Sequence, residues 1–316
     1  MSEKTVNLVN KDLLVKFVHS LDKKGSEFQS RFAEVLLNLW HPERPLRSIT
    51  TDIDFELLKI AFPQFKEVIT YYQIQVIVSK KLKRPFQACP VLLLGEAGLG
   101  KTYFASELAK LLALPYFEFS LATATANFAL SGSDTQWGDG RPGFIIKSIA
   151  ESPVANPFIL IDELDKAGKG LRYDPITPFY SLLEPHSARR FRDESIPLDV
   201  DVRNVIWIAT ANEYEMIHGP ILSRFKQFVI KQPTPQEMLG VIDSIYSTLR
   251  SHSDLGELIA PVLNSECKNQ LVNLSPREVR LALDEAIMSA LFNDRSELIS
   301  SDLPRVEKEQ RRVGFL

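Results

Sequence analysis

At residues 95–102 the chain reads Gly95-Glu96-Ala97-Gly98-Leu99-Gly100-Lys101-Thr102, which fits G-x-x-x-x-G-K-S/T, the pattern of a phosphate-binding loop. The apolar run Val91–Leu94 precedes this segment, and a helical pattern over Tyr103–Leu112 follows it. Strand, loop and helix therefore come in the order that such a loop requires. A chance glycine turn is the alternative interpretation, and the matching flanks on both sides make it rare.

Each residue type in the loop has a use in binding phosphate. Glycines let backbone N–H groups approach phosphate oxygens, and the helix that opens at Gly100 directs its positive end toward the anion. Lys101 is expected to reach the β and γ phosphates, and the Thr102 hydroxyl to bind Mg²⁺. We expect the phosphates of ATP to be surrounded by Gly95, Glu96, Ala97, Gly98, Leu99, Gly100, Lys101, Thr102 and Tyr103.

A second acidic motif follows the apolar run Phe158–Ile161, where the chain continues with Asp162 and Glu163. A buried strand that ends at the carboxyl edge of a parallel sheet places such carboxylates in the ligand crevice. Asp162 is expected to hold Mg²⁺, directly or through water, and Glu163 to orient and polarise the attacking water. The alternative, an acidic turn without function, is less favoured downstream of a phosphate loop.

The arrangement of apolar segments predicts an α/β protein with a parallel sheet. Short apolar runs alternate with helical stretches, which is typical of a sheet covered on both faces. The runs lie at 91–94, 116–121, 158–161, 205–209 and 228–230. Helical spacing marks 1–62, about 63–82, 236–250 and 275–292. We therefore expect an N-terminal helical domain at 1–62, an α/β nucleotide-binding domain at 63–232, a helical lid at 233–300 and a charged, loosely held tail at 301–316.

Composition excludes several classes of protein. The 316 residues are 45% hydrophobic and 24% charged with a net charge of −3, so wholesale disorder and a globally basic nucleic-acid binder are disfavoured. No apolar run approaches the roughly 20 residues of a membrane span, and no apolar signal core follows the N-terminus. Cys89 and Cys267 are far apart and the five histidines are scattered, so neither a disulfide framework nor a structural zinc site is predicted. A cytoplasmic setting without membrane contact is the expectation.

These motifs, together with three later segments, resemble the AAA+ ATPase family. Ile206–Asn212 is similar to the sensor-1 strand, which implies that Asn212 contacts the γ-phosphate or its water. Pro220–Phe225 is similar to the arginine-finger segment, which makes Arg224 the finger. Ser275-Pro276-Arg277 is similar to the sensor-2 start of the lid helix; Arg277 is preferred to Arg280, one turn later, because it stands at the helix start. Ser275 and Glu278 independently predict a capping box there.

Within that family the chain resembles the ATPase module of Lon proteases over about residues 65–295. The likeness rests on the glycine-containing segment Thr135–Gly143, which is similar to a pore loop, and on Ile161–Lys166, Leu182–Pro185 and Ile208–Asn212. Only 21 residues follow Arg295, so we expect no peptidase domain, and no Ser–Lys dyad can be assigned. Trp137 departs from the usual residue of the pore segment, which puts peptide threading in question.

The resemblance implies a Mg²⁺-dependent ATPase that works as a homo-oligomeric, hexameric ring and remodels a protein client. Its implied catalytic residues are Lys101, Glu163, Asn212 and Arg224, of which Arg224 would act on the ATP of a neighbouring subunit. The alternative is a nucleic-acid-associated motor or loader, for which Arg189, Arg190 and Arg192 supply a local basic run. A slow nucleotide-dependent switch or scaffold is the third possibility.

Overall fold

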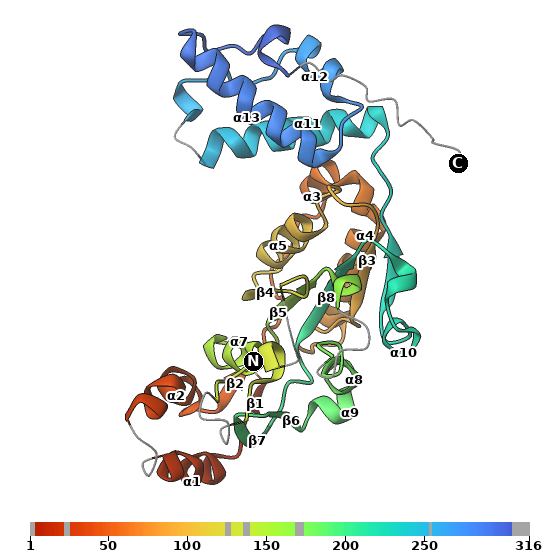
Figure 1. The fold of residues 1–316 in the computed structure, drawn as a ribbon. Coiled ribbons are helices and arrows are strands. Elements are labelled where there is room, and N and C mark those ends of the chain that lie inside the picture. The colour runs from red at the N-terminus through yellow and green to blue at the C-terminus, as the bar shows by residue number, and fades with distance from the viewer. Residues whose placement is uncertain are drawn as a thin grey trace, which may run out of the picture. The chain divides into compact units, whose positions relative to one another are not determined.

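The computed structural model describes residues 4–21, 26–123, 128–134, 140–167, 174–252 and 255–304. The chain divides into two compact units, which are described one at a time (Figure 1). The first unit comprises Met1–Phe55, Lys66–Ala97 and Lys101–Ile230. The second comprises Glu56–Phe65, Gly98–Gly100 and Lys231–Leu316.

A five-stranded sheet forms the centre of the first unit. Its strands are β3 (Val91–Leu94), β4 (Tyr116–Ser120), β5 (Phe158–Asp162), β8 (Ile206–Ala211) and β9 (Lys226–Val229). They lie in the order β4-β5-β8-β3-β9, and every neighbouring pair is parallel. Strands β3 and β8 are buried along their whole length, which explains why they are continuous apolar runs in the sequence. The predicted α/β fold with a parallel sheet is confirmed.

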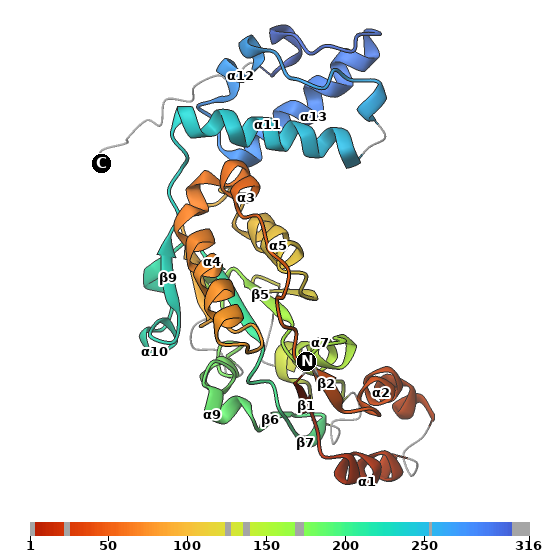
Figure 2. The same cartoon turned by 180° about the vertical axis from the view of Figure 1, so that it is seen from behind.

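Helices on both sides of the sheet exclude water from it. The helix α5 (Lys101–Leu111) contacts β4, β5 and β8, while Tyr71 and Tyr72 of α4 (Lys66–Lys81) place their rings against Phe228 and Phe158. Figure 2 shows α4 in front of the strands. On the opposite face, Ile145 and Ile149 of α7 (Phe144–Glu151) share one buried cluster with Ile159 and Ile161, which alternate along β5 with Phe158. The helices of this part of the chain are α4 (Lys66–Lys81), α5 (Lys101–Leu111), α6 (Phe128–Ser131), α7 (Phe144–Glu151), α8 (Phe179–Leu182), α9 (Pro185–Ala188) and α10 (Gly219–Leu222), with short 3₁₀ turns η3 (Leu164–Lys166) and η4 (Tyr214–Met216).

The N-terminal segment contains the predicted helices and also a small sheet that its sequence did not reveal. The helices are α1 (Lys11–Leu21) and α2 (Ser26–Leu39). The strands β1 (Thr5–Asn7) and β2 (Glu43–Pro45) pair antiparallel, and with three residues each they are too short to show an alternating pattern. Buried side chains of both helices, Leu14 and Phe32 among them, belong to one continuous core with the main sheet.

A β-hairpin packs against two glycines, Gly132 and Gly143, through its residue Asp193. It consists of β6 (Phe191–Asp193) and β7 (Ile196–Val200), and the buried Asp193 accepts a hydrogen bond of 2.8 Å from the Gly143 backbone N–H. Gly132 has a φ of +80°, and a Cβ there would lie 2.1 Å from Asp193 Oδ1. A Cβ at Gly143 would lie 2.3 Å from both Gly132 N and Leu130 O. These two glycines are therefore required by close packing.

Replacing Gly143 with alanine should destabilise the first unit by about 1–3 kcal/mol, because the new methyl group meets backbone atoms that cannot rotate away. Gly219→Ala is the matched control, since a Cβ at Gly219 meets nothing within 4 Å and should change stability by less than about 0.5 kcal/mol. Urea-unfolding midpoints of the two variants give the comparison. Equal midpoints would show that the close approach at Gly143 has no energetic consequence.

Asp193 also makes the stability of this unit depend on pH. Burial raises the pKa of Asp193 to about 6 from its ordinary value of 3.8, against the opposing effect of hydrogen bonds from Ser195 and Gly143. The folded state therefore holds a proton between these two pH values that the unfolded state releases, and stability falls as the pH rises through this window. The fall should be about 1.4 kcal/mol per pH unit up to pH 6 and should then level off. Asp193→Asn should remove this slope in urea titrations at pH 5, 6 and 7; an unchanged slope would contradict the assignment.

The second unit is helical and has its own core. Its helices are α3 (Glu56–Ala61), α11 (Pro235–His252), α12 (Ser265–Leu271) and α13 (Pro276–Phe292), with 3₁₀ turns η1 (Pro63–Phe65), η5 (Leu255–Glu257) and η6 (Ser300–Asp302). Met238, Ile242, Leu283 and Ile287 are among its buried residues. The predicted capping box at the start of α13 is confirmed: the Ser275 hydroxyl accepts from the Glu278 N–H, and the Glu278 carboxylate accepts from the Ser275 N–H at 2.7 Å.

Among the residues that the structure describes, no helix is both long enough and apolar enough to cross a lipid bilayer.

Candidate active site

The carboxyl edge of the sheet brings three predicted motifs together. The phosphate loop follows β3, Asp162 ends β5, and Asn212 follows β8. These strands are parallel neighbours, so the segments that follow them meet at one edge, where ligands bind in open α/β sheets. The Gly95 N–H donates to the Ala211 carbonyl at 3.1 Å, which joins the start of the loop to the end of β8.

The loop has the backbone conformation that its glycines predict. Gly98 and Gly100 have φ values of +86° and +82°, in the left-handed region that residues with a Cβ rarely adopt. Lys101 follows them and begins α5. The loop geometry therefore depends on glycine at both positions.

Lys101 connects the loop to the end of β8. Its side chain is buried, and Nζ donates to Gly95 O at 2.7 Å, to Glu96 O at 2.8 Å and to Asn212 Oδ1 at 2.8 Å. Burial lowers the pKa of Lys101, and the carboxylates of Asp162, Asp165 and Glu163 oppose that change. All three ammonium protons thus have acceptors, which a bound phosphate oxygen can replace.

Oxygen donors of the kind that Mg²⁺ prefers gather beside Lys101. The Thr102 hydroxyl lies 3.0 and 3.1 Å from the two carboxylate oxygens of Asp162. Thr210 donates its hydroxyl proton to Asp162 Oδ1 and accepts at 3.0 Å from the Glu163 N–H. A hydroxyl and a carboxylate next to a phosphate loop fit a magnesium ion, which binds few protein ligands and relies on substrate phosphates for the rest.

Thr210 and Asp165 are part of this site although no sequence motif indicates a role for them. Thr210 is the one hydroxyl residue in the otherwise apolar strand β8, and that signal could have identified it. Asp165, whose side chain is inaccessible to solvent, accepts from the Asn212 N–H at 3.2 Å and lies 3.4 Å from Lys166 Nζ. The two residues hold the backbones of Glu163 and Asn212 in place.

Glu163 occupies a strained position directly after β5. Its φ of +57° and ψ of +51° are left-handed values that non-glycine residues adopt at some energetic cost. Thr210 restrains its backbone N–H, while its side chain remains partly exposed. A partly exposed carboxylate beside the Thr102–Asp162 pair can receive a proton from a water molecule bound there.

Arg224 is the one predicted catalytic residue that does not lie at this edge. It precedes the amino end of β9, whereas the phosphate loop follows the carboxyl end of the adjacent, parallel β3. Arg224 Nε lies 3.1 Å from Glu184 Oε1, and the guanidinium lies 5.6 Å from the centre of the Tyr180 ring. Its side chain is 24% exposed. Within one chain, Arg224 and Lys101 are therefore at opposite edges of the sheet.

The remaining predicted site residues are exposed or outside the described part of the chain. Within the second unit, the Arg277 N–H donates to Gly98 O at 3.3 Å, so the start of α13 contacts a glycine of the phosphate loop. Arg277 and Arg280 are both exposed, and Tyr103 on α5 is 37% exposed. Of the predicted pore segment, residues 135–139, including Trp137, lie outside the described residues.

Comparisons of the sequence with known proteins find a matching family and several relatives. Residues 91–233 match the ATPase family associated with various cellular activities (AAA). The mitochondrial Lon protease homolog of Phaeodactylum tricornutum is 31% identical over 188 residues, 60% of this chain and 21% of that protein. The Lon protease of Chlamydia trachomatis is 26% identical over 240 residues, 75% of this chain and 29% of that protein. The chain thus spans less than a third of the length of these relatives.

A comparison of structures agrees on the fold. A mutant of RuvB from Thermotoga maritima has a TM-score of 0.51 at 14% identity, covering 82% of this chain and 71% of that chain. At this identity the likeness shows the fold alone. The sequence matches lead to one identification: residues 91–233 match the AAA family of ATPases, and the chain is similar to Lon proteases over more than half of its length.

Proposed function

We propose that this chain is a Mg²⁺-dependent ATPase that works in a hexameric ring in the cytoplasm and uses ATP hydrolysis to remodel or unfold a protein client. The observation that carries the proposal is a pair of side-chain hydrogen bonds at one edge of the sheet, from Lys101 to Asn212 and from Thr102 to Asp162. Similarity to AAA ATPases and Lon proteases supports the same activity.

In this proposal Gly95 to Tyr103 surround the phosphates, and Lys101 exchanges its loop carbonyls for phosphate oxygens. Thr102 and Asp162 hold Mg²⁺, which when bound supplies positive charge against the phosphate oxygens. Because Lys101 donates to Asn212, a new acceptor for Lys101 also changes the partners of Asn212. This link connects the loop to the residue proposed to sense the γ-phosphate.

Glu163 is proposed to accept a proton from the attacking water, and Asn212 to position that water. Thr210 and Asp165 then act as positioning residues, since each contacts the backbone of one of these two. Arg277, at the start of α13, is proposed as a second phosphate sensor, with its hydrogen bond to Gly98 as the supporting contact. The proposed chemistry consists mainly of orientation and charge stabilisation.

Arg224 is proposed to complete the site of a neighbouring subunit. It lies at the amino edge of the sheet, so its own phosphate loop is at the wrong end of β3 for a direct contact. A head-to-tail interface that repeats around a closed ring brings the amino edge of one subunit to the carboxyl edge of the next. This requires Arg224 to leave Glu184, its partner within the chain.

A protein client is favoured over a nucleic acid. The likeness to Lon proteases supports it, and the basic run weakens as an alternative because Arg192 forms an ion pair with Asp199. We expect an unfolded protein such as reduced casein to raise the ATPase rate of the full chain several-fold, whereas DNA or RNA leaves it unchanged. Stimulation by nucleic acid alone would overturn the client assignment, and stimulation by neither would support a switch or scaffold.

A further inference from the structure

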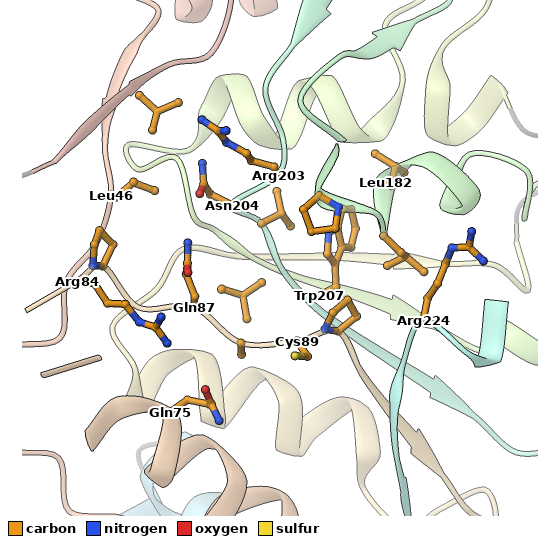
Figure 3. Close-up of a pocket in the computed structure, with 18 of the residues that line it drawn as sticks. Leu46, Gln75, Arg84, Gln87, Cys89, Leu182, Arg203, Asn204, Trp207 and Arg224 are labelled. Carbon is orange, nitrogen blue, oxygen red and sulfur yellow. The ribbon is translucent and has the colours of Figure 1, made fainter. Parts of the chain in front are cut away.

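The first unit contains a cavity whose lining includes no residue of the phosphate loop. Its volume is about 760 Å³, within the range of ligand-binding pockets, and it lies at the amino edge of the sheet. Pro90 and Val205 line it from positions just before β3 and β8. Figure 3 shows Arg84 and Arg224 toward opposite sides of this cavity, with Gln87 and Trp207 between them.

The lining of this cavity is cationic. Lys4, Arg84, Arg203 and Arg224 line it, and no lining residue carries a carboxylate. Arg203 forms an ion pair with Asp201, and Arg224 forms one with Glu184; neither acidic residue lines the cavity. Within the described part of the chain, neither Lys4 nor Arg84 has an acidic partner, so two cations face the cavity without a counter-charge.

The side-chain amide of Asn204, which also lines this cavity, lacks a hydrogen-bond acceptor among the described residues. Asn204 is only 7% exposed, and among the described residues its Nδ2 has no partner. A buried donor without an acceptor carries a desolvation cost that a bound ligand can remove. Gln75 and Gln87 add two more amides to the lining. Side-chain amides can pair with both the N–H and the C=O groups of a peptide backbone.

The walls of the cavity discriminate between classes of anionic ligand. Leu46, Leu182 and Trp207 contribute apolar surface. Trp207 is 4% exposed and makes an edge contact with Phe179, so its ring face is not open for stacking by a nucleobase. Aliphatic side chains can pack on such walls without a stacking platform. Cations, amides and aliphatic walls together match a peptide that carries carboxylates.

We propose that this cavity, defined by Lys4, Arg84, Gln87, Asn204 and Trp207, binds a short acidic peptide segment of a partner protein. Carboxylates of the segment pair with Lys4 and Arg84, its backbone accepts from Asn204, and its aliphatic side chains contact the apolar wall. Charge complementarity identifies the occupant. The five defining residues have no role in the proposed ATP hydrolysis, although Arg224, the proposed finger, lines another side of the same cavity.

Fluorescence anisotropy of the full chain with a dye-labelled peptide of glutamate, serine and leucine tests this proposal. The peptide should bind, and its counterpart with glutamine in place of glutamate should bind at least about tenfold more weakly. Arg84→Gln, an exposed position, should weaken binding of the glutamate peptide about tenfold. Lys147→Gln removes a positive charge from an exposed position on α7 in the same unit and should change binding less than about twofold.

Asn204→Asp supplies a nearly isosteric second variant. It places a carboxylate in the cavity and should abolish peptide binding while ATP binding and the melting temperature stay close to those of the wild type. Equal binding of the two peptides, or equal losses for Arg84→Gln and Lys147→Gln, would overturn the proposal. Competition by inorganic phosphate as effective as that by the peptide would also overturn it, in favour of a small-anion site. ATP turnover, measured in parallel, reports separately on the proposed function.

Discussion

Replacing Arg224 with alanine should lower the ATP turnover number by about 10³–10⁵-fold and leave ATP binding nearly unchanged, as expected for an arginine finger. In the folded chain Arg224 lies at the amino edge of the sheet, away from the phosphate loop that follows β3. Its removal therefore leaves the groups that bind ATP in the same subunit intact. Turnover under saturating ATP and equilibrium binding of a fluorescent ATP analogue measure the two properties.

Glu184→Gln is the control that separates a catalytic from a structural Arg224. This variant removes the ion pair of 3.1 Å but keeps the guanidinium and its contact with Tyr180. If Arg224 acts as the finger, Glu184→Gln should retain turnover. Equal loss in the two variants would mean that the ion pair itself matters, and the finger assignment would then be wrong.

Glu163→Gln should lower turnover by about 10²–10⁴-fold, the usual contribution of a general base, while ATP binding persists. Glutamine has nearly the same shape but cannot accept the proton of the attacking water. The backbone N–H of residue 163 still donates to Thr210, so the Thr102–Asp162 pair should remain in place. Single-turnover hydrolysis together with nucleotide binding gives the readout.

Glu213→Gln provides the matched control for this carboxylate. Glu213 follows Asn212 directly, is 57% exposed, and pairs with Lys166 at 3.1 Å. It should therefore influence turnover only weakly, as an exposed ion pair does. Normal hydrolysis by Glu163→Gln, or equal losses in both variants, would remove Glu163 from the proposed role.

The elements that could be predicted from the sequence are those whose burial leaves a continuous pattern. Strands β3 and β8 are buried on both faces, so every position of β3 and every position of β8 except Thr210 is apolar, and both could be predicted as strands. The phosphate loop was equally clear because glycine is required at the positive φ values of Gly98 and Gly100. Local chemistry also revealed the capping box of α13, which involves residues three positions apart.

The features that could not be predicted depend on contacts between distant parts of the chain. Asp193 is buried because Gly132 and Gly143 pack against it, a relation that spans about fifty residues. The role of Asp165 depends on an amide in the segment after β8. The cavity at the amino edge combines Lys4 with Asn204, which no spacing rule connects. Such assemblies become visible only when the strand order is known.

In the proposed ring, one subunit supplies Glu163 and its neighbour supplies Arg224 to the same ATP. Mixing the inactive Arg224→Ala and Glu163→Gln proteins tests this sharing of residues between subunits. In a head-to-tail ring, a complete site forms wherever an Arg224→Ala subunit receives Arg224 from a Glu163→Gln neighbour, which random mixing of equal amounts produces at about a quarter of the interfaces. We predict that the mixture recovers up to about a quarter of the wild-type ATPase rate, with catalysis confined to those sites. A mixture that assembles but stays as inactive as its components would contradict this sharing.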